Sequence, residues 1–142
     1  MKTWPDGARF DGQWKDDTHQ GHGTWRQPDG AEYVGEWSSG KRHGTGTLRF
    51  PDGNVFEGQF KAAEMDGIGT FLWASGDADV GTYRADEPTG VGVRWSADRQ
   101  TAWQLLNGQQ EEAKISLDEA RALAAKIGVP VPAPSAPAAH ES

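Results

Sequence analysis

The chain has 142 residues, enough for one domain and a tail, and its 19 glycines follow no Gly-X-Y period, which excludes a collagen-like fibre. It contains no cysteine, which excludes a disulfide framework and a Cys-based metal site. With 14 Lys and Arg residues against 21 Asp and Glu residues the formal net charge is −7, which disfavours nucleic acid and anionic lipid as partners because both require a basic surface.

The N-terminal residues lead directly into a motif that recurs along the chain, with no signal peptide or membrane span before it, so we expect a cytoplasmic protein. Pro5-Asp6-Gly7 recurs as Pro28-Asp29-Gly30 and Pro51-Asp52-Gly53, and Ala74-Ser75-Gly76 is a degenerate fourth copy. Three glycine positions and one aromatic position keep the same interval of 23 residues. These series are Gly12, Gly35, Gly58 and Gly81; Gly21, Gly44, Gly67 and Gly90; Gly23, Gly46, Gly69 and Gly92; and Trp14, Trp37, Phe60 and Tyr83.

A fixed interval of this length indicates stacked repeats, in which each unit is one supersecondary element that cannot bury its own apolar face. Aromatic residues fill the first part of the chain, and only Trp103 lies beyond residue 96. We therefore predict a repeat domain over residues 1–108, a linker and helix over 109–128, and a disordered tail over 129–142. The units are expected at about 5–27, 28–50, 51–73 and 74–96, with a partial fifth hairpin to about 108.

Within each unit the side chains alternate with a period of two. In the second unit Tyr33, Gly35 and Trp37 fall on one face, and the residues between them fall on the other. Alternation over residues 31–37 and again over 44–50, joined by residues 38–43 and bounded by turn signals, indicates two half-buried strands. The predicted fold is an all-β repeat array, a single curved antiparallel sheet of successive β-hairpins.

The regular glycines in these strands are expected to be structural. Glycine weakens a strand, so its repeated use suggests that rings or backbone approach closely at Gly12, Gly35, Gly58 and Gly81. In a symmetric hairpin Gly46 lies opposite Gly35, and Gly44 lies opposite Trp37. The missing β-carbons then leave pits into which neighbouring aromatic rings can lie.

The fourth unit departs from the pattern at two inward-facing sites. Phe10, Tyr33 and Phe56 occupy the site that Asp79 fills in the fourth unit, and Trp25, Leu48 and Phe71 occupy the site that Arg94 fills. Counting back from a symmetric loop places the two sites opposite each other in every hairpin. We therefore predict that an Asp79–Arg94 ion pair replaces an apolar cross-strand pair.

These units resemble the MORN (membrane occupation and recognition nexus) repeat. The resemblance covers about residues 4–96 and rests on Tyr33-Val34-Gly35-Glu36-Trp37, Gly40-Lys41-Arg42-His43-Gly44-Thr45-Gly46 and Pro51-Asp52-Gly53. The first and third units are good copies, whereas the fourth lacks its first aromatic residue. The resemblance implies a curved sheet of hairpins that binds or scaffolds without catalysis, in some members in association with membranes or the cytoskeleton.

Catalysis is the alternative that the residues support least. No nucleophile elbow, phosphate-binding loop or HExxH helix occurs, so we expect no catalytic residue, no cofactor and no metal. His19 and His22 lie near Asp16 and Asp17, which admits a metal site, but we favour a solvated loop with His22 at an outward strand position. His43 is interpreted as a loop residue, within the compact basic cluster Lys41-Arg42-His43.

We expect the ring-bearing face to remain partly exposed as a groove that binds another protein, with recognition of phospholipid headgroups as the alternative. Acidic residues at outward positions, such as Glu32 and Glu57, favour a helical or extended partner segment with apolar anchors and basic flanks. Trp37 and Phe60, in the middle of the array, are the strongest candidates for binding hot spots. The full set of predicted groove residues is Trp14, Trp25, Tyr33, Trp37, Phe56, Phe60 and Phe71.

The C-terminal segment predicts a short helix over residues 117–127. Ser116 and Glu119 form a capping-box pattern at its start, and Gly128 followed by Pro130 ends it. The apolar stripe consists of Leu117, Ala120, Leu123, Ala124 and Ile127. Either the helix caps the last strand, which we favour because repeat arrays need covered ends, or it docks to another protein.

Overall fold

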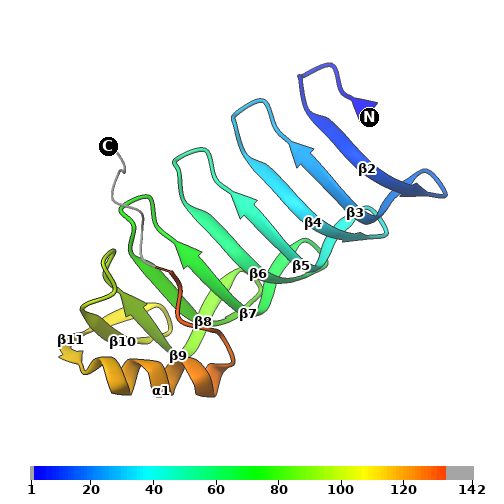
Figure 1. The fold of residues 1–142 in the computed structure, drawn as a ribbon. Helices are drawn as coiled ribbons and strands as arrows, with labels where there is room; N and C mark the ends of the chain where they lie inside the picture. The colour runs from blue at the N-terminus through cyan, green and yellow to red at the C-terminus, as the bar shows by residue number, and fades with distance from the viewer. Residues whose placement is uncertain (1, 134–142) are drawn as a thin grey trace.

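The computed structural model describes residues 2–133 and shows one antiparallel sheet followed by one helix. The sheet has 11 strands that pair strictly in chain order, and Figure 1 shows the hairpins side by side in a row that ends beside the helix. This confirms the predicted single curved sheet of successive hairpins. The elements are β1 (Lys2–Thr3), β2 (Arg9–Lys15), β3 (Thr18–Arg26), β4 (Glu32–Ser38), β5 (Lys41–Arg49), β6 (Val55–Lys61), β7 (Glu64–Leu72), β8 (Ala78–Arg84), β9 (Glu87–Trp95), β10 (Ala102–Leu106), β11 (Gln109–Ile115) and α1 (Leu117–Ile127).

The hairpin turns within the units are shorter than the sequence suggested. Ser39 and Gly40 alone join β4 to β5, with φ angles of 50° and 80°. Two consecutive residues with positive φ are typical of the type I′ turn, whose twist matches that of the flanking strands. Lys41, Arg42 and His43 therefore lie in strand β5, and their assignment to a loop was wrong.

A bulge displaces one part of the predicted register. Gly35 does lie opposite Gly46, as expected, but Trp37 pairs with Arg42 and not with Gly44, because the register shifts between Gly35 and Trp37. Gly44 has a φ of +71°, which a side chain rarely adopts, and it pairs with Phe60 of the next hairpin. Equivalent shifts occur in the β2–β3, β6–β7 and β8–β9 pairs. Bulges of this kind bend the strands and increase their twist, which curves the sheet.

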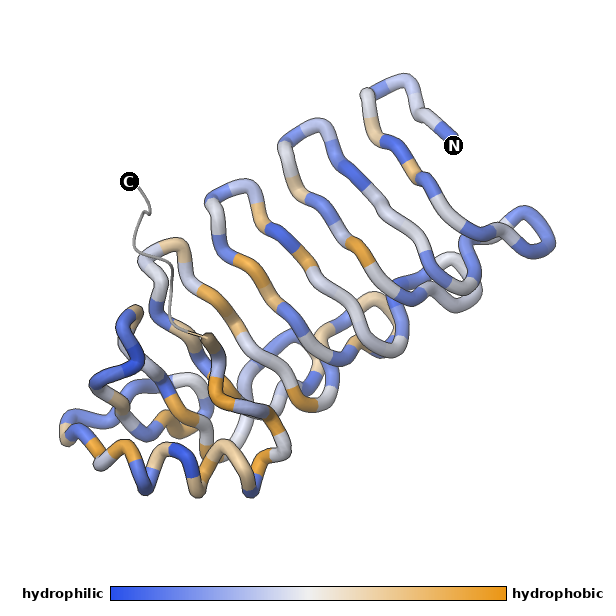
Figure 2. The backbone as a smooth tube through the Cα atoms, in the orientation of Figure 1, coloured by the Kyte–Doolittle hydropathy of each residue, from blue (hydrophilic) through white to orange (hydrophobic). Residues whose placement is uncertain are grey.

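The two faces of the sheet carry separate hydrophobic clusters. We call the first face the ring face, because it bears the buried rings of Phe10, Tyr33, Trp37, Phe56, Phe60 and Tyr83. The opposite back face bears a second cluster, formed by Val80, Val93, Trp95, Ala102, Ala120, Ala124 and Val129. In Figure 2 hydrophobic segments occur along the hairpins and alternate with hydrophilic ones in the helix. The ring face is thus built along the array, whereas the back face is built only at its C-terminal end.

Helix α1 spans the predicted residues and carries the predicted caps. The Ser116 side chain accepts a hydrogen bond from the Glu119 backbone, the Glu119 side chain accepts one from the Ser116 backbone, and Gly128 ends the helix with a φ of 99°. The helix contacts β8, β9 and β10, so it does cover the C-terminal end of the array. It lies on the back face, however, and not over the edge of the last strand (Figure 1).

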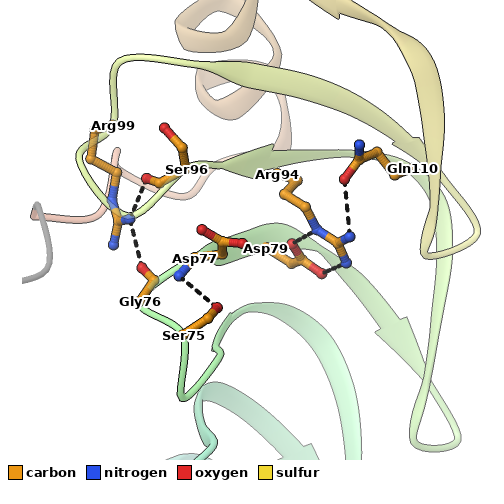
Figure 3. Close-up of polar contacts among 8 residues, drawn as sticks. All are labelled: Ser75, Gly76, Asp77, Asp79, Arg94, Ser96, Arg99 and Gln110. Carbon is orange, nitrogen blue, oxygen red and sulfur yellow. Dashed lines mark hydrogen bonds and ion pairs between the residues drawn. The ribbon is translucent and has the colours of Figure 1, made fainter.

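Two predicted boundaries were wrong. The sheet does not end near residue 108, because residues 109–115, which we had assigned to a linker, form β11. Tail residues 129–133 are also placed: Val129 is 8% exposed within the back-face cluster, and the Pro132 carbonyl accepts a hydrogen bond from Arg99 Nε at 3.3 Å. Arg99 Nη1 also donates to the Gly76 and Ser96 carbonyls (Figure 3). The rest of the predicted disordered tail, 134–142, lies outside the described residues.

Candidate functional site

A row of side chains crosses the ring face from strand to strand at one level of the sheet. We call this row the ladder, and each of its members is the direct cross-strand neighbour of the next. It consists of Phe10, Trp25, Tyr33, Leu48, Phe56, Phe71, Asp79, Arg94 and Trp103. Its members alternate between buried and half-buried. Phe10, Tyr33 and Phe56 are 0% exposed and Asp79 is 7% exposed, whereas the members between them are only partly buried.

The buried rings lie in pits formed by glycine pairs, as the sequence predicted. A β-carbon added at Gly58 would lie 2.8 Å from Phe56 Cζ, and one at Gly35 would lie 2.7 Å from Tyr33 Oη. The Tyr33 hydroxyl donates a hydrogen bond of 2.9 Å to the Glu36 carbonyl, and burial raises its pKa to about 12. The glycines are therefore required by the rings that cover them.

Trp37 and Phe60, the residues that we predicted as binding hot spots in a partly exposed groove, are buried. Trp37 is 8% exposed and Phe60 is 3% exposed. Each stands edge-on between two ladder rings: Trp37 lies 5.1 Å from Phe10 and 5.2 Å from Tyr33, and Phe60 lies 5.1 Å from Tyr33 and 5.4 Å from Phe56. Edge-to-face pairs of this kind are a favourable arrangement for aromatic rings. Tyr33, Trp37, Phe56 and Phe60 belong to the core of the array, and Tyr33 and Trp37 also border an open hollow.

The exposed part of the ring face is a different set of residues, which we call the apolar strip. Each of its side chains is partly exposed, and its members are Trp4, Trp25, Leu48, Phe50, Phe71 and Trp73. Of the predicted groove residues only Trp25 and Phe71 belong to it. Trp14 is also 38% exposed, but it lies in the first hairpin, where no preceding unit covers it as Phe10 covers Trp37.

Sequence reasoning left four members of this strip out of the predicted groove: Leu48, which it placed only at an inward-facing site, and three residues beside turns. Trp4, Phe50 and Trp73 each precede a turn of the Pro-Asp-Gly series, so they keep the same interval as the glycines. The centre of the Phe71 ring lies 5.7 Å from that of Phe50 and 4.6 Å from that of Trp73. These contacts join a half-buried ladder residue to the residues beside the turns, so that they form one surface. Their position in the repeat was a signal that could have identified them.

His19 was also misplaced by the sequence analysis. It lies in β3, not in a solvated loop, and its ring stacks on Phe10 at 3.7 Å with an interplanar angle of 5°. Burial, and next the nearby charge of Lys2, lowers the pKa of His19. His22 is exposed on the same strand. Within residues 2–133 no three His, Cys, Asp or Glu side chains are grouped in a way that could hold a metal ion.

Arg42 places a cation in the middle of the ring face. Its guanidinium lies 5.8 Å from the centre of the Tyr33 ring and 5.5 Å from that of Phe60, and Nη2 donates a 2.6 Å hydrogen bond to the Ala63 carbonyl. Beside it lies an open hollow of about 330 Å³, with Trp25 and Leu48 in its wall. A ligand in this hollow would meet apolar side chains and a fixed positive charge.

The predicted Asp79–Arg94 ion pair is present on the ring face. Arg94 Nε donates to Asp79 Oδ1 at 2.7 Å and Arg94 Nη2 to Asp79 Oδ2 at 2.8 Å, and Nη1 reaches Gln110 (Figure 3). The guanidinium also lies 5.7 Å from the centre of the Trp73 ring. The hydrogen bonds to Asp79 raise the pKa of Arg94.

The acidic residues at outward strand positions lie on the back face. Asp11, Glu36 and Glu57 alternate with the ring-bearing positions of their strands and therefore point to the back face. Glu32 is on the same face, in ion pairs with Arg26 and Arg49. The charged groups beside the apolar strip are instead Lys2, whose ammonium lies 5.5 Å from the centre of the Trp4 ring, Arg42 and the Asp79–Arg94 pair.

Comparison with known families matches the repeated units directly. A family model described as MORN repeat matches residues 10–32, 33–55, 56–78 and 80–101, so the degenerate fourth unit is included. No curated protein shows significant similarity to the chain. Among the described residues, the one helix, α1, is too short and too polar to span a membrane.

Proposed function

This chain belongs to the MORN repeat family, whose repeats are generally non-catalytic and are associated with protein or membrane-lipid interaction, and on that premise we propose that it is a protein-interaction module. It binds a segment of another protein along the apolar strip. The observation that carries the proposal is the alternation of the ladder, which leaves every second apolar side chain partly exposed across several hairpins.

The composition of the strip supports binding to protein. Contiguous exposed apolar surface marks interaction sites, and Trp is among the residue types most enriched at binding hot spots. Trp25 and Trp73 supply two such rings, and Trp73 is 37% exposed. The buried rings beneath hold the strip in place, so little conformational entropy is lost when a partner binds.

The partner segment carries apolar anchors with basic flanks. The net charge of −7 attracts such a segment over a distance, which raises its rate of association. The charges that the bound segment would meet differ along the strip. Arg42 is beside its central part, and an acidic residue, Asp79, lies near its far end. A helix or an extended strand can present anchors at the spacing of the strip.

Recognition of phospholipid headgroups is the second candidate, because the repeat family is associated with lipid as well as with protein. Lipid binding would need free basic side chains at the surface, each contributing about 1 kcal/mol. Arg42 is already engaged by the Ala63 carbonyl and by two rings. The charge balance of the chain also opposes an anionic membrane.

The first prediction tests the strip with peptides selected from a displayed random library against the intact chain. Trp25→Ala and Phe71→Ala are expected to weaken the selected peptides by at least tenfold, since the loss of a hot-spot ring costs about 2 kcal/mol or more. Val34→Ala is the matched control, because Val34 lies on the back face of the same array and is 44% exposed. Dissociation constants are measured by calorimetry, and a melting curve is recorded for each variant.

Two outcomes contradict the proposal. One is that folded Trp25→Ala and Phe71→Ala variants bind the peptides as tightly as the unmodified chain. The other is that no peptide is enriched while the chain sediments with vesicles of phosphatidylcholine and phosphatidylserine, which favours the lipid function. Trp37→Ala is unsuitable for this test, because Trp37 is 8% exposed and its removal would lower stability directly.

A further inference from the structure

The fourth unit keeps the glycine pit of the other units but has no ring to fill it. In the first three units a β-carbon added at Gly12, Gly35 or Gly58 would lie 2.9, 2.7 or 2.8 Å from an atom of the aromatic side chain in the pit. At Gly81 the nearest heavy atom is Gly92 Cα, at 3.7 Å. Asp79 stands where the ring would originate, and its side chain is turned to Arg94.

An open pocket occupies the place of the missing ring. It has a volume of about 220 Å³, and its wall includes Phe71, Trp73, Gly81, Tyr83, Gly92 and Leu105. A closed apolar cavity of roughly 150 Å³ is enough to admit benzene. The pocket is therefore large enough for one aromatic side chain, and we call it the ring slot.

We propose that the ring slot binds an aromatic side chain of the partner protein, which takes the place of the ring that the fourth unit lacks. This inference rests on the proposed function and names the anchor that the partner inserts. The array itself shows what fits the site: Phe56, at the equivalent position of the preceding unit, stands edge-on to Phe60 at 5.4 Å and to Tyr83 at 4.9 Å. In the fourth unit Tyr83 lines the slot, where its ring can contact the aromatic side chain that the partner inserts.

The occupant that we propose is an aromatic residue of the partner protein. The charges around the slot indicate which residue type lies next to the inserted aromatic residue in the partner sequence. Asp79 and Asp86 are in the wall, and no Lys, Arg or His from the described part of the chain is among the lining residues. Since Asp86 is exposed, a Lys or Arg beside the aromatic residue can pair with it.

The test uses the intact chain and two blocked tripeptides, acetyl-Lys-Phe-Lys-amide and acetyl-Lys-Ala-Lys-amide. Binding is followed by the NMR shifts of the backbone amides of Gly81 and Gly92 and of the Trp73 indole. The expected result is a saturable change with the Phe peptide and at least tenfold weaker binding of the Ala peptide. Equal binding of the two peptides, or no change at these three signals, overturns the proposal.

Two variants fill the slot from within and should remove this binding. Gly81→Val has room for its β-carbon, unlike substitution at the other pit glycines, and valine suits a strand. Asp79→Phe combined with Arg94→Phe rebuilds the Phe56–Phe71 pair of the preceding unit and serves if Gly81→Val does not fold. Val34→Ala on the back face is expected to bind as the unmodified chain does.

Failure of this inference is distinguishable from failure of the proposed function. If a filled-slot variant, folded by its melting curve, still binds the Phe peptide, the slot is not the site. The role of the strip is judged separately by Trp25→Ala, because Trp25 lies outside the slot wall. Should Gly81→Val abolish self-association of the chain in sedimentation while the Phe peptide causes no shift, the occupant is a second copy and the proposal is wrong.

Discussion

Phe56 and Phe71 face each other across one hairpin, yet only Phe56 is fully buried. The difference comes from the direction in which each ring extends. The tip of Phe56 lies over Gly58 and Gly69, where a side chain on either residue would clash with it. Phe71 turns toward Phe50 and Trp73 at the surface. At the residue scale, burial is therefore decided by the available pit and not by the face alone.

The second prediction concerns the Asp79–Arg94 ion pair. The Asp79 side chain is 10% exposed and that of Arg94 is 23% exposed, so Arg94→Leu leaves a nearly buried carboxylate without its partner. The expected loss is about 2 kcal/mol of unfolding free energy, less than the 3–5 kcal/mol of a fully buried pair because some exposure remains. Urea unfolding measures it.

Arg26→Leu is the matched control for this prediction. Arg26 also pairs with a carboxylate across the sheet, that of Glu32, but its side chain is 53% exposed. Exposed pairs contribute about 0–1 kcal/mol, so this variant should unfold near the midpoint of the unmodified chain. Equal losses in the two variants would show that the burial of Asp79 has no energetic consequence.

At the element scale, the position of α1 on the sheet is set by a change in residue type at equivalent back-face positions of successive units. The position held by Asp11, Val34 and Glu57 in the first three units is held by Val80 in the fourth, and the Thr24, Thr47 and Thr70 series ends in Val93. These valines are 0% exposed beneath α1. The change from Thr to Val in the second series was visible in the sequence as a signal for the docking face.

The third prediction is that replacing Leu117, Leu123 and Ile127 by Ser lowers the melting temperature. All three pack against the back-face cluster, and each loses apolar contact on substitution. Even with its caps, α1 should stay helical only while it is docked on the sheet, because isolated helices of this length are marginally stable in water. Differential scanning calorimetry measures the change.

The double variant Ala122→Ser with Ala125→Ser is the control for the helix prediction, because both alanines are exposed on the same helix. It should melt close to the unmodified chain. If the triple variant also melts there, the contacts of α1 with the sheet do not contribute to stability, and a docking role toward another protein becomes the better explanation for the apolar stripe.

At the scale of the whole molecule, the array is unevenly supported. Each hairpin contacts mainly its neighbours, so stability is close to a sum of local terms. Strands β8 and β9 carry packed side chains on both faces, through Tyr83 on the ring face and Val80 and Val93 on the back face. Strands β2 and β3 have a packed cluster on the ring face alone.

The fourth prediction follows from this asymmetry. Amide hydrogen exchange followed by NMR should be slower in β8 and β9 than in β2 and β3, because opening the first hairpin exposes fewer buried contacts. The triple Ser variant of α1 should reduce the difference by exposing the back-face cluster. Uniform protection across all hairpins would indicate that the array unfolds as a single cooperative unit.

The sequence by itself determined the features that depend on local or periodic patterns. The interval between Gly12 and Gly35 defined the units, the alternation around Tyr33 defined the strands, and the capping box at Ser116 defined the start of the helix. The Asp79–Arg94 pair was predicted as well, because it lies beyond the register shift, where the register counted from a symmetric loop agrees with the observed one. These features need no knowledge of how the hairpins pack against one another.

Only the tertiary structure decided which of the aligned side chains are accessible. Trp37 is buried by Phe10 of the preceding hairpin, and Trp14 is exposed because it has no such neighbour. The bulge at Gly44 moves Trp37 opposite Arg42, and the ring slot beside Gly81 exists because one ring is absent from an otherwise regular stack. Burial is set by contacts between neighbouring hairpins, and a period along one strand does not record them.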